Sequence, residues 1–162
     1  MLILGIDPGY DRLGLAVIQK LPHQKETLLE SCCITSAKQD EFSRRLATLG
    51  EPIVSILNRL PIDGIAIENL FVTKNQKTAT RVAEVRGMIL YLAGSKKIPV
   101  IEFTPPAIKL AVTGFGRADK KQVTAMAQKL LAIPPETKRL DDEFDAMVIA
   151  LAGLAHASTW LK

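Results

Sequence analysis

Five short apolar runs along the chain predict the strands of a sheet. Residues 2–6 form an apolar run that ends in the turn sequence Asp-Pro-Gly, and residues 13–18 form a second run soon after it. A polar turn then leads to residues 27–35, so the first third of the chain predicts an antiparallel meander. The two remaining runs, residues 64–67 and 99–103, each adjoin segments with helical patterns, and we expect both to be strands.

Helical spacing of apolar residues fills the long segments between and after these runs. It predicts helices at residues 41–60, 78–93 and 142–157. Pro52 lies inside the first of these helices and is expected to kink it, because proline removes one backbone donor.

Capping residues define two further helices. Thr104 is the expected N-cap of a short helix that stops at Gly114. Asp119 and Gln122 form a variant capping box, which predicts that the next helix begins there and runs through Leu131.

The order of these elements indicates the fold class. Strands that come first and then alternate with helices are typical of an α/β fold, here a mixed five-stranded sheet flanked by helices. The sequence contains no internal repeat, low-complexity tract or linker, so we predict a single domain over residues 1–162. Functional sites in such sheets gather at the carboxyl ends of the strands.

Composition excludes several classes of protein. With 48% hydrophobic and 23% charged residues, the chain is neither collagen-like nor intrinsically disordered. Its longest apolar stretch, residues 146–157, is well short of the roughly 20 residues that cross a bilayer. The N-terminus lacks the basic region and cleavage site of a signal peptide, so we expect no membrane partner. The adjacent Cys32 and Cys33 suit neither a disulfide nor a metal template, which favours a cytoplasmic location.

The charge balance points to an anionic partner. The 21 lysine and arginine residues exceed the 17 aspartate and glutamate residues, giving a net charge of +4. A mild basic excess of this kind is compatible with nucleic-acid binding without requiring it.

Four carboxylates are placed where they can converge. Asp7 and Glu68 each end a predicted buried strand, and Asp142 and Asp145 lie three residues apart on one face of the last helix. Such a cluster repels itself unless cations neutralise it, and hard oxygen ligands suit two Mg²⁺ ions. Two ions about 4 Å apart can activate a water and stabilise the leaving oxygen in phosphodiester hydrolysis.

Most of these acids also have a structural interpretation. Asp7 before Pro-Gly is typical of a turn, and Glu68 is compatible with a satisfied acid at a strand end. Asp141 and Glu143 fit ordinary acids favoured by a helix N-terminus. Asp145 differs, because the helix after it is apolar on nearly every face and a buried carboxylate needs a partner.

Four segments resemble, in the same order and at similar spacing, the motif blocks of the RuvC family of Holliday-junction resolvases. They are residues 5–9 (GIDPG), 66–71 (AIENLF), 114–123 (GFGRADKKQV) and 142–146 (DEFDA). The resemblance covers essentially the whole chain. It implies an RNase H-like fold, a homodimer, and Mg²⁺-dependent paired nicking of four-way DNA that leaves 5′-phosphate and 3′-hydroxyl ends.

The resemblance also implies roles for individual residues. The family's catalytic carboxylates, which hold two Mg²⁺ with Mn²⁺ as a substitute, match Asp7, Glu68, Asp142 and Asp145. Lys109 and Lys120 match catalytic basic residues beside the active site that neutralise phosphate or help to position water. RuvA and RuvB branch-migration proteins are candidate partners.

Expected DNA contacts lie in two polar segments. Phe71 matches the family's junction-probing aromatic position, although core packing is the competing interpretation. The basic residues expected to contact DNA are Lys74, Lys77, Arg117, Lys120 and Lys121. For Lys121 a solvated surface position remains an equal alternative. The predicted helix at residues 78–93 carries more apolar side chains than one interface needs, and the excess is available for the dimer.

Two residues depart from the family pattern. Leu13 stands where many relatives have a small hydroxyl residue, and Ala16 where a second glycine is common. Substrate contacts of the first hairpin are therefore expected to differ.

Two other functions remain open at this stage, and a third is disfavoured. The opening residues 6–14 are also similar to RuvC-like nucleases that process RNA, although those generally lack the block at residues 66–71. A non-catalytic junction-binding module predicts binding without nicking. An actin-like nucleotide-binding ATPase would need a second lobe, for which the chain has no room.

Overall fold

The computed structural model describes residues 1–69, 76–134 and 136–160, except for the side chains of Lys77 and Trp160. Within these residues the strands are β1 (Leu2–Asp7), β2 (Arg12–Gln19), β3 (Thr27–Thr35), β4 (Gly64–Glu68) and β5 (Val100–Phe103). The helices are α1 (Phe42–Arg59), α2 (Gln76–Ser95), α3 (Pro105–Thr113), α4 (Lys120–Leu130), α5 (Asp141–Ala155) and α6 (Ala157–Trp160). No helix in these ranges is both long enough and apolar enough to cross a membrane.

The described strands form one mixed sheet in the order β3-β2-β1-β4-β5. Strands β1, β2 and β3 pair antiparallel, which confirms the predicted meander. Strand β4 pairs parallel with β1, and β5 pairs parallel with β4. The predicted five-stranded α/β architecture is therefore confirmed.

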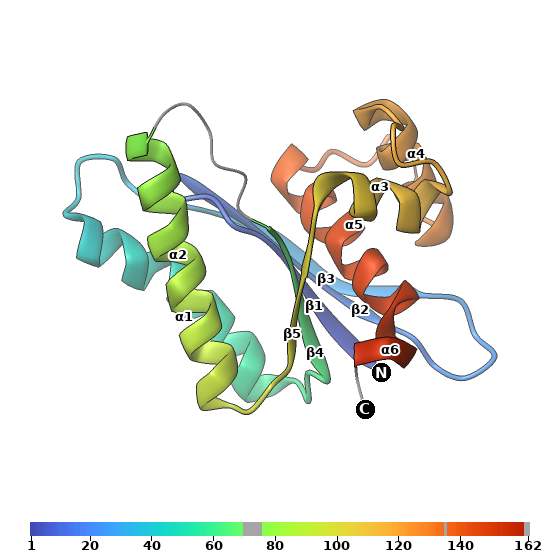
Figure 1. Ribbon diagram of the computed structural model, residues 1–162, viewed down its shortest axis with the longest axis horizontal. Helices are drawn as coiled ribbons and strands as arrows, with labels where there is room; N and C mark the ends of the chain where they lie inside the picture. The colour runs from blue at the N-terminus through green and yellow to red at the C-terminus, as the bar shows by residue number, and fades with distance from the viewer. Residues whose placement is uncertain (70–75, 135, 161–162) are drawn as a thin grey trace.

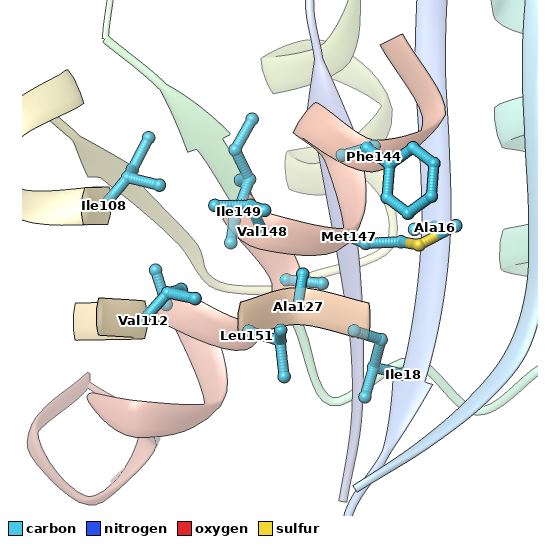
Figure 2. Packing of buried hydrophobic residues seen from close by; sticks show 14 of the residues in the cluster. Ala16, Ile18, Ile108, Val112, Ala127, Phe144, Met147, Val148, Ile149 and Leu151 are labelled. Carbon is cyan, nitrogen blue, oxygen red and sulfur yellow. The ribbon is translucent and has the colours of Figure 1, made fainter. Parts of the chain in front are cut away.

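Helices cover both faces of the sheet (Figure 1). Helices α1 and α2 pack on one face, where Leu49 and Ile53 of α1 and Ile89 of α2 are completely buried. Helices α3, α4 and α5 lie on the other face, with α5 directly against the strands. Its side chains Met147 and Leu151 pack among residues of the sheet and the outer helices (Figure 2).

Glycine allows α5 to approach the sheet unusually closely. A Cβ atom on Gly5 of β1 would overlap the carbonyl oxygen of Ala146 and lie 2.6 Å from the amide nitrogen of Ala150. On β2, a Cβ on Gly14 would overlap the carbonyl oxygen of Asp142. Because α5 rests on these two strands through backbone contacts, its first turn is held at the end of β1.

Helix termini follow the predicted caps. The Thr104 side chain accepts a hydrogen bond from the Ala107 amide, and Gly114 ends α3 in the left-handed conformation with φ of 74°. Asp119 and Gln122 form both hydrogen bonds of the capping box that opens α4.

Other helix boundaries differ from the prediction. Glu41 is the N-cap of α1 instead of its first residue. Helix α2 begins at Gln76, and the predicted single helix over residues 142–157 ends at Ala155, where His156 separates it from the short α6.

The two departures from the family pattern lie in the core. Leu13 is completely buried on the α1–α2 face, and Ala16 is buried against α5. Both side chains face the core, so any change they make to the substrate contacts of the first hairpin would act through packing.

The close contact between α5 and β1 predicts a large cost for Gly5→Ala. We expect a loss of about 2 to 4 kcal/mol in the free energy of unfolding, because the added methyl meets backbone that cannot move aside locally. Gly87→Ala in α2 is the matched control, since a Cβ there has nothing within 4 Å, and it should stabilise the chain by about 0.5 to 1 kcal/mol. Urea denaturation of both variants tests this, and equal effects would contradict it.

Candidate active site

Parallel pairing places the first two acids side by side. Ile6 of β1 pairs with Ile67 of β4, so the next residues, Asp7 and Glu68, leave the sheet at the same edge. The sequence predicted this arrangement from two strands that each end in an acid.

Helix α5 brings the other two acids to that edge. Gly14 pairs with Asp7 across the β1–β2 ladder, and the Asp142 backbone rests on Gly14. Asp145 lies one turn further along α5 and lines a pocket together with Glu68. The four carboxylates predicted from the sequence therefore gather around the ends of β1 and β4.

Burial and mutual repulsion oppose ionisation in this cluster. Burial, and then the charges of Asp145, Glu68 and Asp142, raise the pKa of Asp7 from 3.8 to about 7. Burial also raises the pKa values of Glu68 and Asp145, and the charge of Asp145 adds to the effect on Glu68. Without bound cations, the folded chain therefore disfavours the fully ionised form of these acids.

Basic side chains neutralise part of this charge. Lys120 Nζ lies 3.1 Å from Asp145 Oδ2 and 3.3 Å from Asp141 Oδ2. Burial lowers the pKa of Lys120, but the hydrogen bond and charge of Asp145 outweigh this and raise it above its usual value. On the other side of the cluster, Arg12 Nε is 3.2 Å from Asp142 Oδ2.

The pocket beside the acids is lined by the predicted basic residues. It has a volume of about 270 Å³ and lies between the end of β4 and helices α3, α4 and α5. Lys109 and Lys120 line it together with Glu68 and Asp145, and the charge of Lys109 lowers the pKa of Glu68 against the larger effect of burial. Acidic and basic groups therefore share one small pocket with apolar walls that include Ile108 and Val123, and this pairing of charges suits a phosphate ester and a cation.

The side-chain oxygens of the four acids are the type of ligand that a hard divalent cation prefers. All four acids offer oxygen ligands, and Asp142 Oδ2 is buried without a hydrogen-bond donor even though it is ion-paired with Arg12. Across the described ranges, no three Asp, Glu, His or Cys side chains are grouped closely enough to bind one ion as they stand. The acids are thus electrostatically coupled, and binding an ion requires their side chains to draw together.

A buried arginine holds the turn that follows Asp7. Arg45 of α1 donates to the Tyr10 carbonyl at 2.8 Å, to Asp11 Oδ1 at 2.5 Å and to Ser36 Oγ at 2.9 Å. These bonds hold Tyr10 and Asp11, the two residues before Arg12.

The predicted DNA contacts are only partly described. Arg117 and Lys121 are exposed on the α3–α4 turn and the first turn of α4, next to Lys120. Phe71 and Lys74 lie outside the described residues. Lys77 belongs to α2, but its side chain also lies outside the description.

Two arginines at the site were not expected from the sequence. Arg12 pairs with Asp142, and Arg86 of α2 donates to the main-chain carbonyl of Glu68. A signal for Arg86 exists in the sequence, because this charge interrupts the apolar stripe that includes Val82, Val85 and Ile89.

Comparisons with known proteins identify the family and the fold of the chain. Residues 3–153 match the family model described as crossover junction endodeoxyribonuclease RuvC. The RuvC of Moorella thermoacetica is 44% identical over 98% of this chain and 92% of its own length, and that of Leifsonia xyli is 38% identical over 97% and 77%. The structure of Thermus thermophilus RuvC in complex with a Holliday junction substrate superposes with a TM-score of 0.90 at 29% identity, covering 97% of this chain and 94% of that one. The fold is therefore RNase H-like, and the chain belongs to the RuvC family of crossover junction endodeoxyribonucleases.

Proposed function

We propose that this chain resolves four-way DNA junctions as a metal-dependent endodeoxyribonuclease, within one domain that spans residues 1–162. The observation that carries the proposal is the gathering of Asp7, Glu68, Asp142 and Asp145 beside two lysines. The similarity to Thermus thermophilus RuvC, which was solved with a Holliday junction, supports junction DNA as the substrate.

The four acids are the proposed ligands of two Mg²⁺ ions, with Mn²⁺ as a substitute. When bound, the ions supply Lewis-acid chemistry to the phosphodiester and to the attacking water. The acids would orient that chemistry, because two of them are fixed at the ends of β1 and β4 and two on a helix that rests on β1 and β2. Burial and the repulsion between neighbouring carboxylates raise the pKa values of Asp7, Glu68 and Asp145, and bound cations would relieve that repulsion.

Lysines near the acids are proposed to act on the scissile phosphate. Lys120 sits in the first turn of α4, where the helix dipole disfavours positive charge, and its ion pairs with Asp141 and Asp145 hold it there. We assign Lys120 and Lys109 to neutralising phosphate charge in the pocket. Arg117 and Lys121 would bind the DNA backbone outside it, and Phe71, Lys74 and Lys77 would contact the junction.

The charge balance of the chain supports this division. Without the four proposed ligands among its 17 acids, the chain has 13 acids against 21 basic residues, a net charge of +8. Affinity for DNA through this basic remainder should fall steeply as salt rises.

An exposed apolar groove supports the proposed homodimer. Leu46, Gly50 and Val54 of α1 and Met88 and Tyr91 of α2 line a groove of about 400 Å³. Tyr91 is 73% exposed and the neighbouring Leu90 is 40% exposed. A second copy on this surface would give a two-fold pair of sites, suited to paired symmetric nicks that leave 5′-phosphate and 3′-hydroxyl ends. We propose a cytoplasmic dimer with RuvA and RuvB as working partners.

Asp7→Asn should abolish nicking while junction affinity stays within about threefold of the parent, because the substitution removes one ligand and leaves the basic surface intact. Labelled four-way DNA, with structured RNA in parallel, would be incubated with Mg²⁺ and the cuts mapped. Asp40→Asn, an acid outside the site, is the matched control and should cut normally. Undiminished cleavage by Asp7→Asn would refute the assigned site, and preferential RNA cleavage would refute the assigned substrate.

Asp7→Asn should also stabilise the metal-free protein. In EDTA at pH 8 we expect the free energy of unfolding to rise by about 1 to 3 kcal/mol, because the fold disfavours the ionised form of a group whose pKa it raises from 3.8 to about 7. The gain should shrink as the pH falls from 8 to 5, since the folded carboxyl then becomes protonated. Urea denaturation at both pH values measures this, and a loss of stability at pH 8 would contradict it.

Tyr91→Glu should convert the dimer to a monomer, because it places a charge in the centre of an apolar contact. Sedimentation velocity measures the association state, and a cruciform plasmid reports whether the two nicks become uncoupled. Leu29→Glu is the matched control, because it changes an exposed apolar residue on β3. Tyr10→Glu would not serve as a control, because Arg45 contacts Tyr10. A dimeric Tyr91→Glu protein would exclude this groove as the interface.

A further inference from the structure

Arg86 is a buried charge with two partners at the catalytic end of the sheet. It lies on α2 and is only 7% exposed. Its Nη1 donates to the main-chain carbonyl oxygen of Glu68, and its Nη2 donates to Glu102 Oε2 at 2.6 Å. One side chain therefore connects α2 to the ends of both β4 and β5.

The strand register shows that this contact reaches the site from the opposite face. Ile67 pairs with Glu102, and Glu68 pairs with Phe103. Ile67 packs in the core under α1 and α2, whereas Phe103 packs in the core under α5. Because paired residues point to the same face of a sheet, the Glu68 carboxylate lies on the α5 side and Glu102 lies on the α2 side. Arg86 thus pairs with Glu102 on its own side and holds Glu68 through the backbone.

The peptide group that follows Glu68 is bonded at both of its polar atoms. Its carbonyl accepts from Arg86, and its amide, which belongs to Asn69, donates to the Phe103 carbonyl at 2.7 Å. A peptide plane held at both atoms cannot rotate freely, so the direction in which the Glu68 side chain leaves the backbone is fixed. Bonds from a charged donor are about twice as strong as neutral ones, which makes Arg86 the stronger of the two restraints.

We propose that Arg86 is a positioning residue for Glu68. From the opposite side of the sheet, Arg86 would set the metal affinity of the active site by holding the Glu68 peptide. The inference rests on the proposed role of Glu68 as a metal ligand. It predicts that loss of the guanidinium weakens metal binding more than the loss of stability alone explains, because outer partners of metal ligands commonly contribute tenfold to a hundredfold in affinity.

A purely structural role is the competing explanation, in which Arg86 only fastens α2 to the sheet. Arg81 supplies the matched control on the same helix. Its Nη1 lies 2.9 Å from Glu84 Oε2 and its guanidinium lies 3.9 Å from the ring centre of Phe42, but no bond to Glu68 is described for it. Arg81→Gln therefore removes the same group from α2 without releasing the Glu68 peptide.

The experiment measures Mn²⁺ binding to the full chain without DNA, by electron paramagnetic resonance, together with the melting temperature of each variant. Arg86→Gln should weaken Mn²⁺ binding by about tenfold to a hundredfold at temperatures where it remains folded. Arg86→Lys keeps a charge near Glu102 but cannot present two parallel donors, so an intermediate loss is expected. Arg81→Gln should bind Mn²⁺ as the parent does, even if its melting temperature falls.

Glu68→Gln separates failure of this inference from failure of the proposed site. If Glu68→Gln binds Mn²⁺ with parental affinity, Glu68 is not a ligand and both ideas are refuted. If Glu68→Gln loses affinity while the folded Arg86 variants retain it, the site stands and the positioning role is overturned. Should Arg86→Gln fail to fold, the lysine variant decides, and parental Mn²⁺ affinity in it refutes the proposal.

Discussion

The backbone contact between α5 and strands β1 and β2 is the constraint on which the active site depends. Gly5 and Gly14 have no side chain between the sheet and the helix, so the helix axis lies closer to the strands than ordinary side chains allow. This contact fixes both the height and the rotation of α5. Asp142 and Asp145 are consequently delivered to the end of β1, where Asp7 leaves the sheet. A larger residue at either glycine would displace half of the acidic set from the other half.

Because the acids lie close together, their carboxylates repel one another, and basic side chains of the chain neutralise part of this charge. Burial and repulsion raise the pKa of Asp7 to about 7, which shows that the fold tolerates this group poorly in its charged form. Lys120 and Arg12 offset part of the excess by pairing with Asp145 and Asp142. If bound metal ions neutralised the acids instead, both basic side chains would be free to contact a bound substrate. The lysine that stabilises the metal-free acids would then be available to a phosphate.

Much of the fold could be predicted because its signals are local. Apolar runs located the strands, and the caps at Thr104, Gly114 and Asp119 located helix ends to the residue, since each depends on a side chain or backbone conformation within one turn. The proximity of Asp7 and Glu68 could be expected only on the condition that their strands are neighbours, and the parallel pairing of β1 with β4 meets that condition.

Contacts between residues far apart in the sequence could not be predicted from local patterns. The partner of Arg12 lies 130 positions away in α5, and the exposure of Tyr91 depends on how α1 packs beside α2. Leu13 illustrates the same limit in reverse. Its departure from the family motif could be seen in the sequence, but its place in the core under α1 follows from the pleat of β2.

Helix α2 joins the two halves of the proposed mechanism. It carries Tyr91 toward the groove assigned to a second copy, and five residues earlier it carries Arg86 to the peptide of Glu68. If α2 shifted as one body when a partner bound, the displacement would reach the guanidinium that holds Glu68. Dimer formation and metal binding would then be coupled through α2. Because such coupling is reciprocal, a dimer contact that strengthens metal binding would itself be strengthened by bound metal.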